Sequence, residues 1–335
     1  MRVAIVGCGF IGNKRLRSLP PDSSVVAVVD PARERAEALA AQARGARPAV
    51  LTDWREAVGR PDVDAVIVST SNDALAPVTG AAVEAGKHVL VEKPAARKPE
   101  ELTPIIAAAA RNRVCVQVGF NHRYHPAFRQ ARTLLESGTL GPLMFIRARY
   151  GHGGRIGYDR EWRANPEISG GGELLDQGVH LIDLSRWFLG DFTSVQGHIA
   201  TFFWDMPVED NGFLLLRTAA GQVAWLHATW TEWKNTFSFE IFARDAKLHI
   251  EGLGGSYGVE RLSYYQMKPA MGPPDTTIWE YPGEDRSWHL EFEAFAQAVE
   301  ARRSPPVTLG DAQAALTIVH QLYAAARPGE KARSE

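Results

Sequence analysis

The first third of the chain alternates short apolar runs with longer segments of mixed polarity. The apolar runs lie at residues 3–6, 25–29, 49–51, 65–69, 88–91 and 114–118. Segments with helical spacing lie between them, at 33–44, 74–85 and 100–112. Because buried strands joined by helices form parallel sheets with right-handed crossovers, residues 1–120 are predicted to form a doubly wound α/β domain.

The pattern changes after residue 120. Residues 143–150 alternate like a strand, 174–189 have helical spacing, and runs rich in aromatic and β-branched residues follow at 195–203, 212–218, 223–230, 237–242 and 247–250. Gly221, between two such runs, suggests a hairpin. Strands in succession without helices between them indicate an open, mostly antiparallel sheet. Residues 121–335 are therefore predicted to form an α+β domain for substrate binding and oligomerisation.

The helix at 174–189 is expected to cover one face of this second sheet. The other face is expected to expose Trp225 and Trp230 and to pack on a partner subunit in a homodimer or homotetramer. Two further helices are predicted at 288–301 and 311–326, with Thr308 or Gly310-Asp311 as the start signal of the last one. That last helix is a candidate to pack back on the first domain.

A glycine-rich turn follows the first apolar run, at Gly7-Cys8-Gly9-Phe10-Ile11-Gly12. In a G-x-G-x-x-G pattern the first glycine permits a tight turn, the second lets the backbone approach a pyrophosphate, and the third lets the helix pack closely on the strand. Free N–H groups at the start of the helix then bind the pyrophosphate. An ordinary turn is the alternative, but the strand–turn–helix–strand order favours dinucleotide binding.

Asp30 ends the second apolar run, where a carboxylate can accept hydrogen bonds from ribose hydroxyls. Its charge would repel a 2′-phosphate, so NAD is predicted in preference to NADP. Arg33 and Arg35 follow closely and would weaken that preference.

Composition and charge narrow the function classes. A length of 335 residues favours two domains, and 45% apolar with 23% charged residues is typical of globular proteins. The net charge of −2 gives no bulk attraction to nucleic acid or anionic membranes, and no apolar run is long enough for a membrane span. Met1 leads directly into a predicted strand, so no leader peptide is expected. Cys8 and Cys115 do not form a disulfide framework or a zinc site, and a cytoplasmic protein is predicted.

A lysine ends the fifth strand of the first domain, in Glu92-Lys93-Pro94. Ligands of open α/β sheets bind at the carboxyl ends of the strands, so Lys93 is expected to project into the cofactor crevice, although a solvated lysine is the alternative. The turn after the fourth strand faces the same crevice. The predicted cofactor-binding residues are therefore Gly7, Gly9, Phe10, Ile11, Gly12, Asp30, Arg33, Ser69, Thr70, Asn72, Glu92 and Lys93.

A second candidate segment begins with Gly170-Gly171-Gly172 and enters the helix at 174–189. Asp176 and His180 are spaced i, i+4 and are expected to share one helix face. A core histidine behind an acid at the start of the helix is the alternative. Zinc binding is disfavoured, because thiolates are missing and the spacing differs from H-E-x-x-H.

Together these motifs resemble those of the Gfo/Idh/MocA oxidoreductase family over essentially the whole chain. The resemblance implies a Rossmann domain followed by a domain with an open, mostly antiparallel sheet, and NAD(P)-dependent redox chemistry on a sugar, a cyclitol or a similar polyol. It assigns the catalytic roles to Lys93, Asp176 and His180. One departure is that many members carry a histidine after the third glycine, where Asn13-Lys14-Arg15 stands here and is expected to tune phosphate contacts.

Chemistry suggests how those roles divide. His180 has the intrinsic pKa to accept the hydroxyl proton, and Asp176 would orient the substrate or the imidazole. Lys93 would donate to the reacting oxygen, although a lysine with a lowered pKa is itself a candidate base. Glu92 is expected to support the nicotinamide or the geometry of Lys93.

Two loops suggest the substrate. Residues 120–126 follow the last strand of the first domain, and residues 150–163 form a glycine-rich loop with arginines and aromatics. The predicted substrate-binding residues are Lys93, Asn121, Arg123, Tyr124, Arg155, Tyr158, Trp162, Arg163, Asp176 and His180. Arg155 and Arg163 are candidate diphosphate contacts, unless they pair with Asp159 and Glu161. His122 and His125 are assigned to substrate binding or packing, and no metal is expected.

The leading function is an NAD-dependent dehydrogenase, or a keto-sugar reductase, acting at a ring hydroxyl such as C3. A nucleotide-sugar such as UDP-N-acetylglucosamine is a plausible substrate, and an inositol or free-sugar dehydrogenase is the alternative. An NAD-retaining glycoside hydrolase is a second class. A non-catalytic dinucleotide-binding regulator is a third, against which the intact Lys93, Asp176 and His180 argue.

Overall fold

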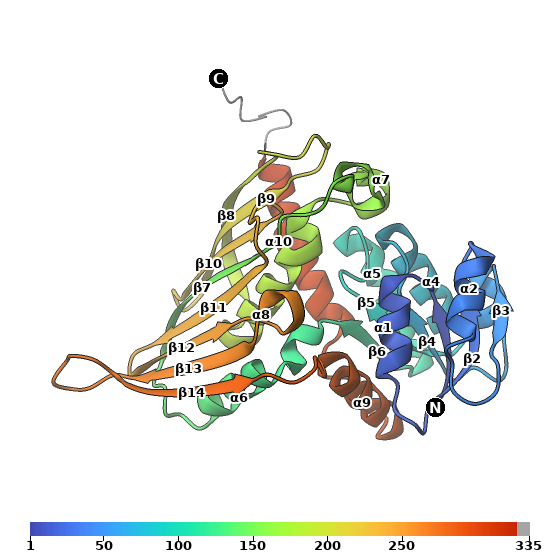
Figure 1. The fold of residues 1–335 in the computed structure, drawn as a ribbon, viewed down its shortest axis with the longest axis horizontal. Coiled ribbons are helices and arrows are strands. Elements are labelled where there is room, and N and C mark those ends of the chain that lie inside the picture. Colours follow the sequence, from blue (N-terminus) through green and yellow to red (C-terminus); the bar gives the residue numbers. More distant parts are fainter. Residues whose placement is uncertain (327–335) are drawn as a thin grey trace. The chain divides into compact units, whose positions relative to one another are not determined.

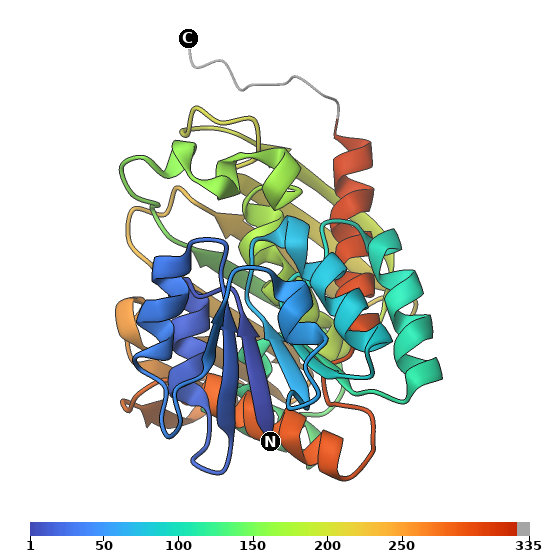
Figure 2. The ribbon, with the colours of Figure 1, turned by 90° about the vertical axis from the view of Figure 1, so that its right-hand side faces the viewer.

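The computed structural model describes residues 1–326, which form two compact units (Figures 1 and 2). The first unit comprises residues 1–121, 167–170 and 288–317. Of the described residues, the second comprises 122–166, 171–287 and 318–326.

A six-stranded sheet forms the centre of the first unit. Its order is β3-β2-β1-β4-β5-β6, and the neighbouring strands are parallel. The strands are β1 (Arg2–Val6), β2 (Ser24–Val29), β3 (Ala49–Leu51), β4 (Ala65–Val68), β5 (His88–Glu92) and β6 (Val116–Gly119). The predicted doubly wound parallel sheet is therefore confirmed, and its strand order reverses at β1 and β4, where open α/β sheets bind dinucleotides.

Helices and turns connect these strands. They are α1 (Phe10–Ser18), α2 (Arg33–Ala40), α3 (Trp54–Val58), α4 (Asn72–Glu84), η1 (Pro99–Glu101) and α5 (Leu102–Asn112). Late in the chain, α9 (Ser287–Glu300) adds Phe292, Phe295 and Ala298 to the core beneath the sheet. The first unit thus includes a helix that is distant in the sequence.

The second unit contains an eight-stranded sheet in the order β14-β13-β12-β11-β7-β10-β9-β8. Its strands are β7 (Leu143–Gly151), β8 (Phe192–Ala200), β9 (Asn211–Thr218), β10 (Val223–Thr229), β11 (Thr236–Ala243), β12 (Ala246–Glu251), β13 (Glu260–Gln266) and β14 (Asp275–Tyr281). Only the β7–β10 pair is parallel in this sheet. The predicted open, mostly antiparallel sheet is confirmed, as is the hairpin at Gly221 between β9 and β10, where φ is +91°.

Helices cover one face of this sheet (Figure 1). The π-helical turn η5 (Leu174–Gly178) continues into α8 (Val179–Leu189), and both pack on β7 and β10. Helix α6 (Pro126–Glu136) packs on β12, β13 and β14. The remaining short elements are η2 (Asn121–Tyr124), η3 (Tyr158–Arg160), η4 (Trp162–Ala164), α7 (Pro166–Ser169) and η6 (Gly255–Tyr257). The predicted cover of the sheet by the helix at 174–189 is confirmed.

One expectation about the opposite face is wrong. Trp225 is 52% exposed, but Trp230 is fully buried and packs with Tyr158 in a small separate core. The two tryptophans are five positions apart, and side chains alternate between the faces of a strand. Trp230 therefore has the parity of the buried residues Ala224, Leu226 and Ala228.

The last helix, α10 (Leu309–Ala325), starts at a reciprocal cap. Asp311 accepts a hydrogen bond from the Thr308 N–H at 2.8 Å, and the Asp311 N–H donates to the Thr308 hydroxyl at 3.3 Å. The predicted start signal at Thr308 is confirmed.

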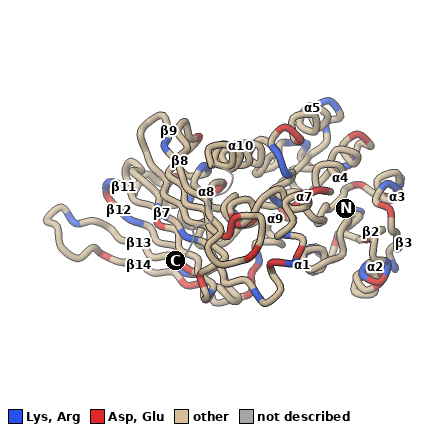
Figure 3. Tube along the Cα trace, turned by 90° about the horizontal axis from the view of Figure 1, so that it is seen from above, with Lys and Arg blue, Asp and Glu red and all other residues tan. Residues whose placement is uncertain are grey.

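Charge is spread over the molecule. Lys and Arg are interspersed with Asp and Glu along the trace (Figure 3). Among residues 1–326, no helix is long and apolar enough to cross a membrane.

Candidate active site

The glycine turn after β1 has little room for any other residue. Gly7 has a φ of +95°, and a Cβ there would lie 2.4 Å from the carbonyl oxygen of Ser69. A Cβ on Gly12 would lie 2.1 Å from the carbonyl oxygen of Gly7. Above Gly9 the space is open within 4 Å. The first and third glycines are thus required by close packing, and the second leaves the backbone accessible, as a pyrophosphate requires.

The same turn leaves donors for an anion. Helix α1 begins after Gly9, and no side chain caps its N-terminus. Asp30 holds the turn, because its Oδ2 accepts the Cys8 N–H at 2.9 Å while its Oδ1 accepts the Ala32 N–H at 2.9 Å. An uncapped helix start beside a fixed carboxylate fits the pyrophosphate and ribose of a dinucleotide.

Other predicted cofactor residues lie at the same edge of the sheet. The Ser69 hydroxyl, after β4, donates to the Gly7 carbonyl at 2.8 Å, and Glu92 is the last residue of β5. Asn72 donates from Nδ2 to the Ser169 carbonyl at 2.8 Å and so holds residues 167–170 within the first unit. Arg33 is exposed and pairs with Glu37. Ser69 and Asn72 of the predicted cofactor set therefore make hydrogen bonds within the first unit, whereas the uncapped start of α1 provides backbone N–H donors.

Arg15 has a role that the sequence did not indicate. Its side chain is 1% exposed and lies between two carboxylates, with Nε 2.6 Å from Glu92 Oε1 and Nη1 2.6 Å from Glu291 Oε2. Its guanidinium also lies over the Trp288 ring, 4.5 Å from the centroid. The expectation that residues 13–15 tune phosphate contacts is wrong for Arg15, because this side chain is buried beneath the sheet edge and holds Glu92, the neighbour of Lys93.

In the second unit, a widened turn of helix carries the other two catalytic candidates. Asp176 lies in η5 and His180 in the first turn of α8. Arg163 donates from Nε to Asp176 Oδ2 at 3.1 Å. Burial alone would lower the Arg163 pKa, but the neighbouring Asp176 carboxylate raises it above its ordinary value. Asp176 thus has a firmly cationic partner.

His180 is 4% exposed and has aromatic neighbours. The His122 ring stacks on it with 3.8 Å between centroids, and the Tyr150 ring meets it edge-on at 6.3 Å. His125 Nδ1 lies 2.8 Å from a carboxylate oxygen of Glu260. The H-x-x-H pair of the sequence is therefore divided between a ring stack and a buried carboxylate contact.

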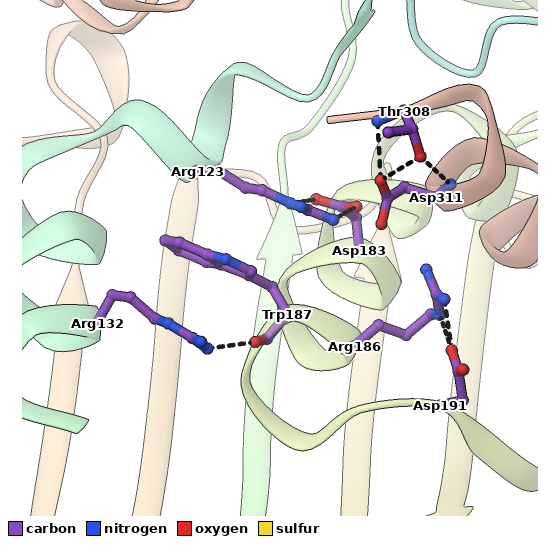
Figure 4. A network of polar contacts seen from close by, with 8 residues as sticks. All are labelled: Arg123, Arg132, Asp183, Arg186, Trp187, Asp191, Thr308 and Asp311. Carbon is purple, nitrogen blue, oxygen red and sulfur yellow. Dashed lines mark hydrogen bonds and ion pairs between the residues drawn. The ribbon is translucent and has the colours of Figure 1, made fainter. Parts of the chain in front are cut away.

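Several predicted substrate residues have partners within the second unit. Arg123 forms a two-pronged ion pair with Asp183, and its guanidinium lies over Trp187 (Figure 4). Arg155 pairs with Glu161 at 2.8 Å. Tyr158 is buried against Trp230, with 4.9 Å between the ring centroids.

The remaining members of that set differ in position. Trp162 stacks on the Arg163 guanidinium at 4.6 Å, Tyr124 and Asn121 are buried, and Lys93 and Asn121 belong to the first unit. Within this set, Arg163 and Asp176 bind one another directly.

A pocket of about 780 Å³ lies elsewhere in the first unit. It is lined by His88 and Val116, the first residues of β5 and β6, and by the C-terminal ends of α5 and α9. These are the amino ends of the strands, whereas the glycine turn is at the carboxyl ends. The pocket is therefore separate from the dinucleotide-binding edge.

Comparison with known proteins agrees with this geometry. A family model described as an oxidoreductase family with an NAD-binding Rossmann fold matches residues 1–120, and a model of the GFO/IDH/MocA C-terminal domain matches residues 128–249. The levoglucosan dehydrogenase of Pseudarthrobacter phenanthrenivorans is 30% identical over 232 residues, which are 66% of this chain and 59% of that protein. The aligned region thus spans less than two thirds of that relative.

Two further similarities extend over nearly the whole chain. The scyllo-inositol 2-dehydrogenase (NAD(+)) of Bacillus subtilis is 26% identical over 330 residues, covering 93% of this chain and 90% of that protein. A solved levoglucosan dehydrogenase in complex with NADH has a TM-score of 0.84 at 23% identity, covering 97% of each chain, which shows a shared fold. With both family models matched in sequence order, the chain belongs to the Gfo/Idh/MocA family of oxidoreductases with an NAD-binding Rossmann fold.

Proposed function

We propose that this chain is an NAD-dependent dehydrogenase that oxidises a ring secondary hydroxyl of an uncharged sugar or cyclitol. The observation that carries the proposal is the helix with Asp176 and His180, where a buried imidazole and an anchored carboxylate lie one turn apart. Relatives named as levoglucosan and inositol dehydrogenases support the substrate class.

The catalytic roles follow from the chemistry of the side chains. Bound NAD supplies the hydride acceptor. The imidazole of His180 accepts the hydroxyl proton, and Asp176, held by Arg163, orients the substrate hydroxyl. Lys93 donates a hydrogen bond from Nζ to the reacting oxygen and stabilises the negative charge that develops there. In the reverse direction the same groups protonate a keto-sugar.

The ion pairs of the 150–163 loop favour a neutral substrate. Arg163 is bound to Asp176 and Arg155 to Glu161. Binding a diphosphate to Arg163 would leave the Asp176 carboxylate without its arginine partner, which costs free energy because this pair is partly buried. A polyol needs only the hydrogen-bonding groups that remain.

A nucleotide-sugar oxidised at C3 is the second candidate. The Arg155 side chain is 68% exposed, and ion pairs between exposed groups contribute little to stability. A diphosphate would therefore displace Glu161 from Arg155 at small cost. UDP-N-acetylglucosamine is the compound that tests this candidate.

Three sequence predictions accompany the proposal. We assign dinucleotide binding to residues 1–120 and substrate binding and oligomerisation to residues 121–335. A homo-oligomer is supported by the exposed apolar side chains of Phe145, Leu215 and Trp225 on adjacent strands of the open sheet. A cytoplasmic location remains a prediction from composition.

The test is a substrate panel with the purified full chain. NAD is mixed with levoglucosan, inositol isomers, free hexoses or UDP-N-acetylglucosamine, and NADH is followed by its absorbance. We expect NADH with at least one uncharged compound and slower turnover of the nucleotide-sugar. The reverse order would support the second candidate.

Absence of NADH throughout the panel would contradict the dehydrogenase proposal. Glycosides are added to the same panel. Release of an aglycone without net NADH would instead indicate an NAD-retaining hydrolase, and dinucleotide binding without either product would indicate a regulator.

A further inference from the structure

The glycine run before the helix that carries Asp176 and His180 is packed against two residues that are distant in the sequence. A Cβ on Gly171 would lie 2.1 Å from the hydroxyl oxygen of Tyr323, in α10. A Cβ on Gly172 would lie 1.9 Å from the carbonyl oxygen of Glu209, in the loop between β8 and β9. The run is therefore packed closely against Tyr323 and the backbone of Glu209, with no room for a side chain at Gly171 or Gly172.

Glu209 accepts hydrogen bonds from three successive N–H groups at the start of this helix. Its Oε2 accepts from Gly172 at 3.0 Å, its Oε1 from Leu174 at 3.1 Å, and its carbonyl oxygen from Glu173 at 3.0 Å. The first N–H groups of a helix have no partner within the helix, and a negative charge there complements the helix dipole. Asp176 follows two residues after Leu174.

Tyr323 completes the arrangement. Its hydroxyl donates to Glu209 Oε1 at 2.8 Å, so the two carboxylate oxygens accept three hydrogen bonds in total. Glu209 is buried and Tyr323 is partly buried, and an ionised carboxyl is the form that can accept all three bonds.

We propose that Glu209 is a positioning residue: its ionised carboxylate sets the geometry of the first turn of the helix that carries Asp176 and His180, and its protonation removes one of the three hydrogen bonds that define that geometry. The inference rests on the proposed function for the roles of those two residues. Glu209 acts through the helix backbone and has no chemical step of its own.

The surroundings of Glu209 set its charge. Burial raises its pKa to about 7, although the Tyr323 hydroxyl and the N–H groups act in the opposite direction. Other ionisable groups near the Glu209–Tyr323 pair are Glu173, the residue before η5, Asp210, the next residue after Glu209, and His320, whose ring contacts that of Tyr323. Asp210 is engaged with the N–H groups of residues 202–204. Protonation turns one acceptor of Glu209 into a donor, so one of its three partners loses its bond.

The experiment compares Tyr323→Phe with the wild-type chain by the pH dependence of kcat. Removing the hydroxyl removes a bond that favours the ionised form, so the pH at which activity is half-maximal moves upward by roughly 0.5–1 unit. Tyr264→Phe removes the hydroxyl of another tyrosine, a buried residue of β13, and should leave that pH unchanged. Glu209→Gln should lower kcat at least tenfold (roughly, for one lost charge-assisted cap), with little change in the KM for NAD.

A second measurement does not require turnover. The protonated carboxyl of Glu209 gives an infrared band whose intensity titrates near neutral pH. The midpoint of this titration should move to higher pH in Tyr323→Phe, and the band should be missing in Glu209→Gln. Hydrogen exchange at the N–H groups of Gly172 or Leu174 should be faster in Glu209→Gln than in wild type at pH 8, because the amide replaces one of the two carboxylate acceptors. If exchange there is equally fast in the two chains, or if the pH profile of kcat stays unchanged in Tyr323→Phe while the midpoint of the band moves, the inference is wrong. If no substrate is oxidised at all, the proposed function fails, and the exchange measurement still decides the inference.

Discussion

Lys93 is the residue whose replacement tests the proposed chemistry most directly. It lies at the end of β5 beside Glu92, so Lys93→Ala removes the donor to the reacting oxygen without changing the glycine turn. We expect kcat to fall by about 10²–10⁴-fold and the affinity for NAD to change little. Steady-state kinetics and NAD titration measure the two quantities.

The matched control is Lys98→Ala, which removes an exposed lysine a few residues away. It should behave as wild type. Turnover that survives in Lys93→Ala would show that the assignment of Lys93 is wrong.

Arg15 is the residue for which a stability effect should be largest. Arg15→Met leaves the carboxylates of Glu92 and Glu291 buried without their guanidinium. Removing one member of a buried ion pair costs about 3–5 kcal/mol in the free energy of unfolding. Denaturant titration of the full chain measures the loss.

Arg33→Ala is the comparison, since the Arg33–Glu37 pair is exposed and should contribute less than about 1 kcal/mol. Equal losses in the two variants would show that the buried position of Arg15 has no special importance.

At the scale of the element, Glu209 at the start of the helix that carries Asp176 and His180 makes stability depend on pH. Glu209 has a folded-state pKa of about 7 against an ordinary value of 4.5, so the folded chain binds more protons between these limits. The stabilisation from this group is therefore fully present at a pH below its unfolded-state pKa of 4.5, and it is lost as the pH rises through its folded-state pKa of about 7. From pH 5 to pH 8 the free energy of unfolding should fall by about 2.5 kcal/mol from this group.

The measurement is a set of denaturant titrations across that pH range for wild type and Glu209→Gln. The glutamine has no proton to lose. The free energy of unfolding of the wild type minus that of Glu209→Gln should therefore decrease as the pH rises. A constant difference would show that Glu209 does not titrate in this range.

The elements that the sequence predicted are those in which burial follows one regular pattern. Strands β1, β2, β4 and β5 are apolar runs because both faces are covered by helices. Strand β14 was missed because its residues are exposed or only partly buried, and so show no alternation. Strand β13 was missed because Glu260 and Ser263 are buried polar residues, and Glu260 is the partner of His125. Helices α3 and α6 were also missed.

At the scale of the whole molecule, the exposed face of the eight-stranded sheet predicts self-association. Trp225 is 52% exposed and is paired across strands with Leu215, which is 45% exposed. Exposing clustered apolar side chains to water is unfavourable. We therefore expect a second copy of the chain to cover this face of the sheet. Trp225→Arg should shift the oligomer toward monomer by at least about tenfold in dissociation constant, because it buries a charge in the interface.

Sedimentation of wild type and variant measures that shift. Met271→Arg changes another exposed apolar residue, in the turn between β13 and β14 instead of on the central strands, and should leave the oligomer intact. Identical sedimentation of the wild type and Trp225→Arg would contradict the proposed interface.

The sequence by itself determined the two-part architecture and the dinucleotide-binding turn. Strand periodicity, glycine spacing and the i, i+4 relation of Asp176 and His180 are local, so neighbouring residues are sufficient to reveal them. For the same reason the family resemblance was visible before any coordinates were considered.

Only the tertiary structure decided the partners of the charged and buried residues. Arg15 meets Glu291, and Gly172 meets Glu209, across long stretches of chain. No periodicity encodes such pairs, because they are created when distant segments are brought together. Burial then determines whether an arginine or a carboxylate contacts solvent, substrate or another side chain.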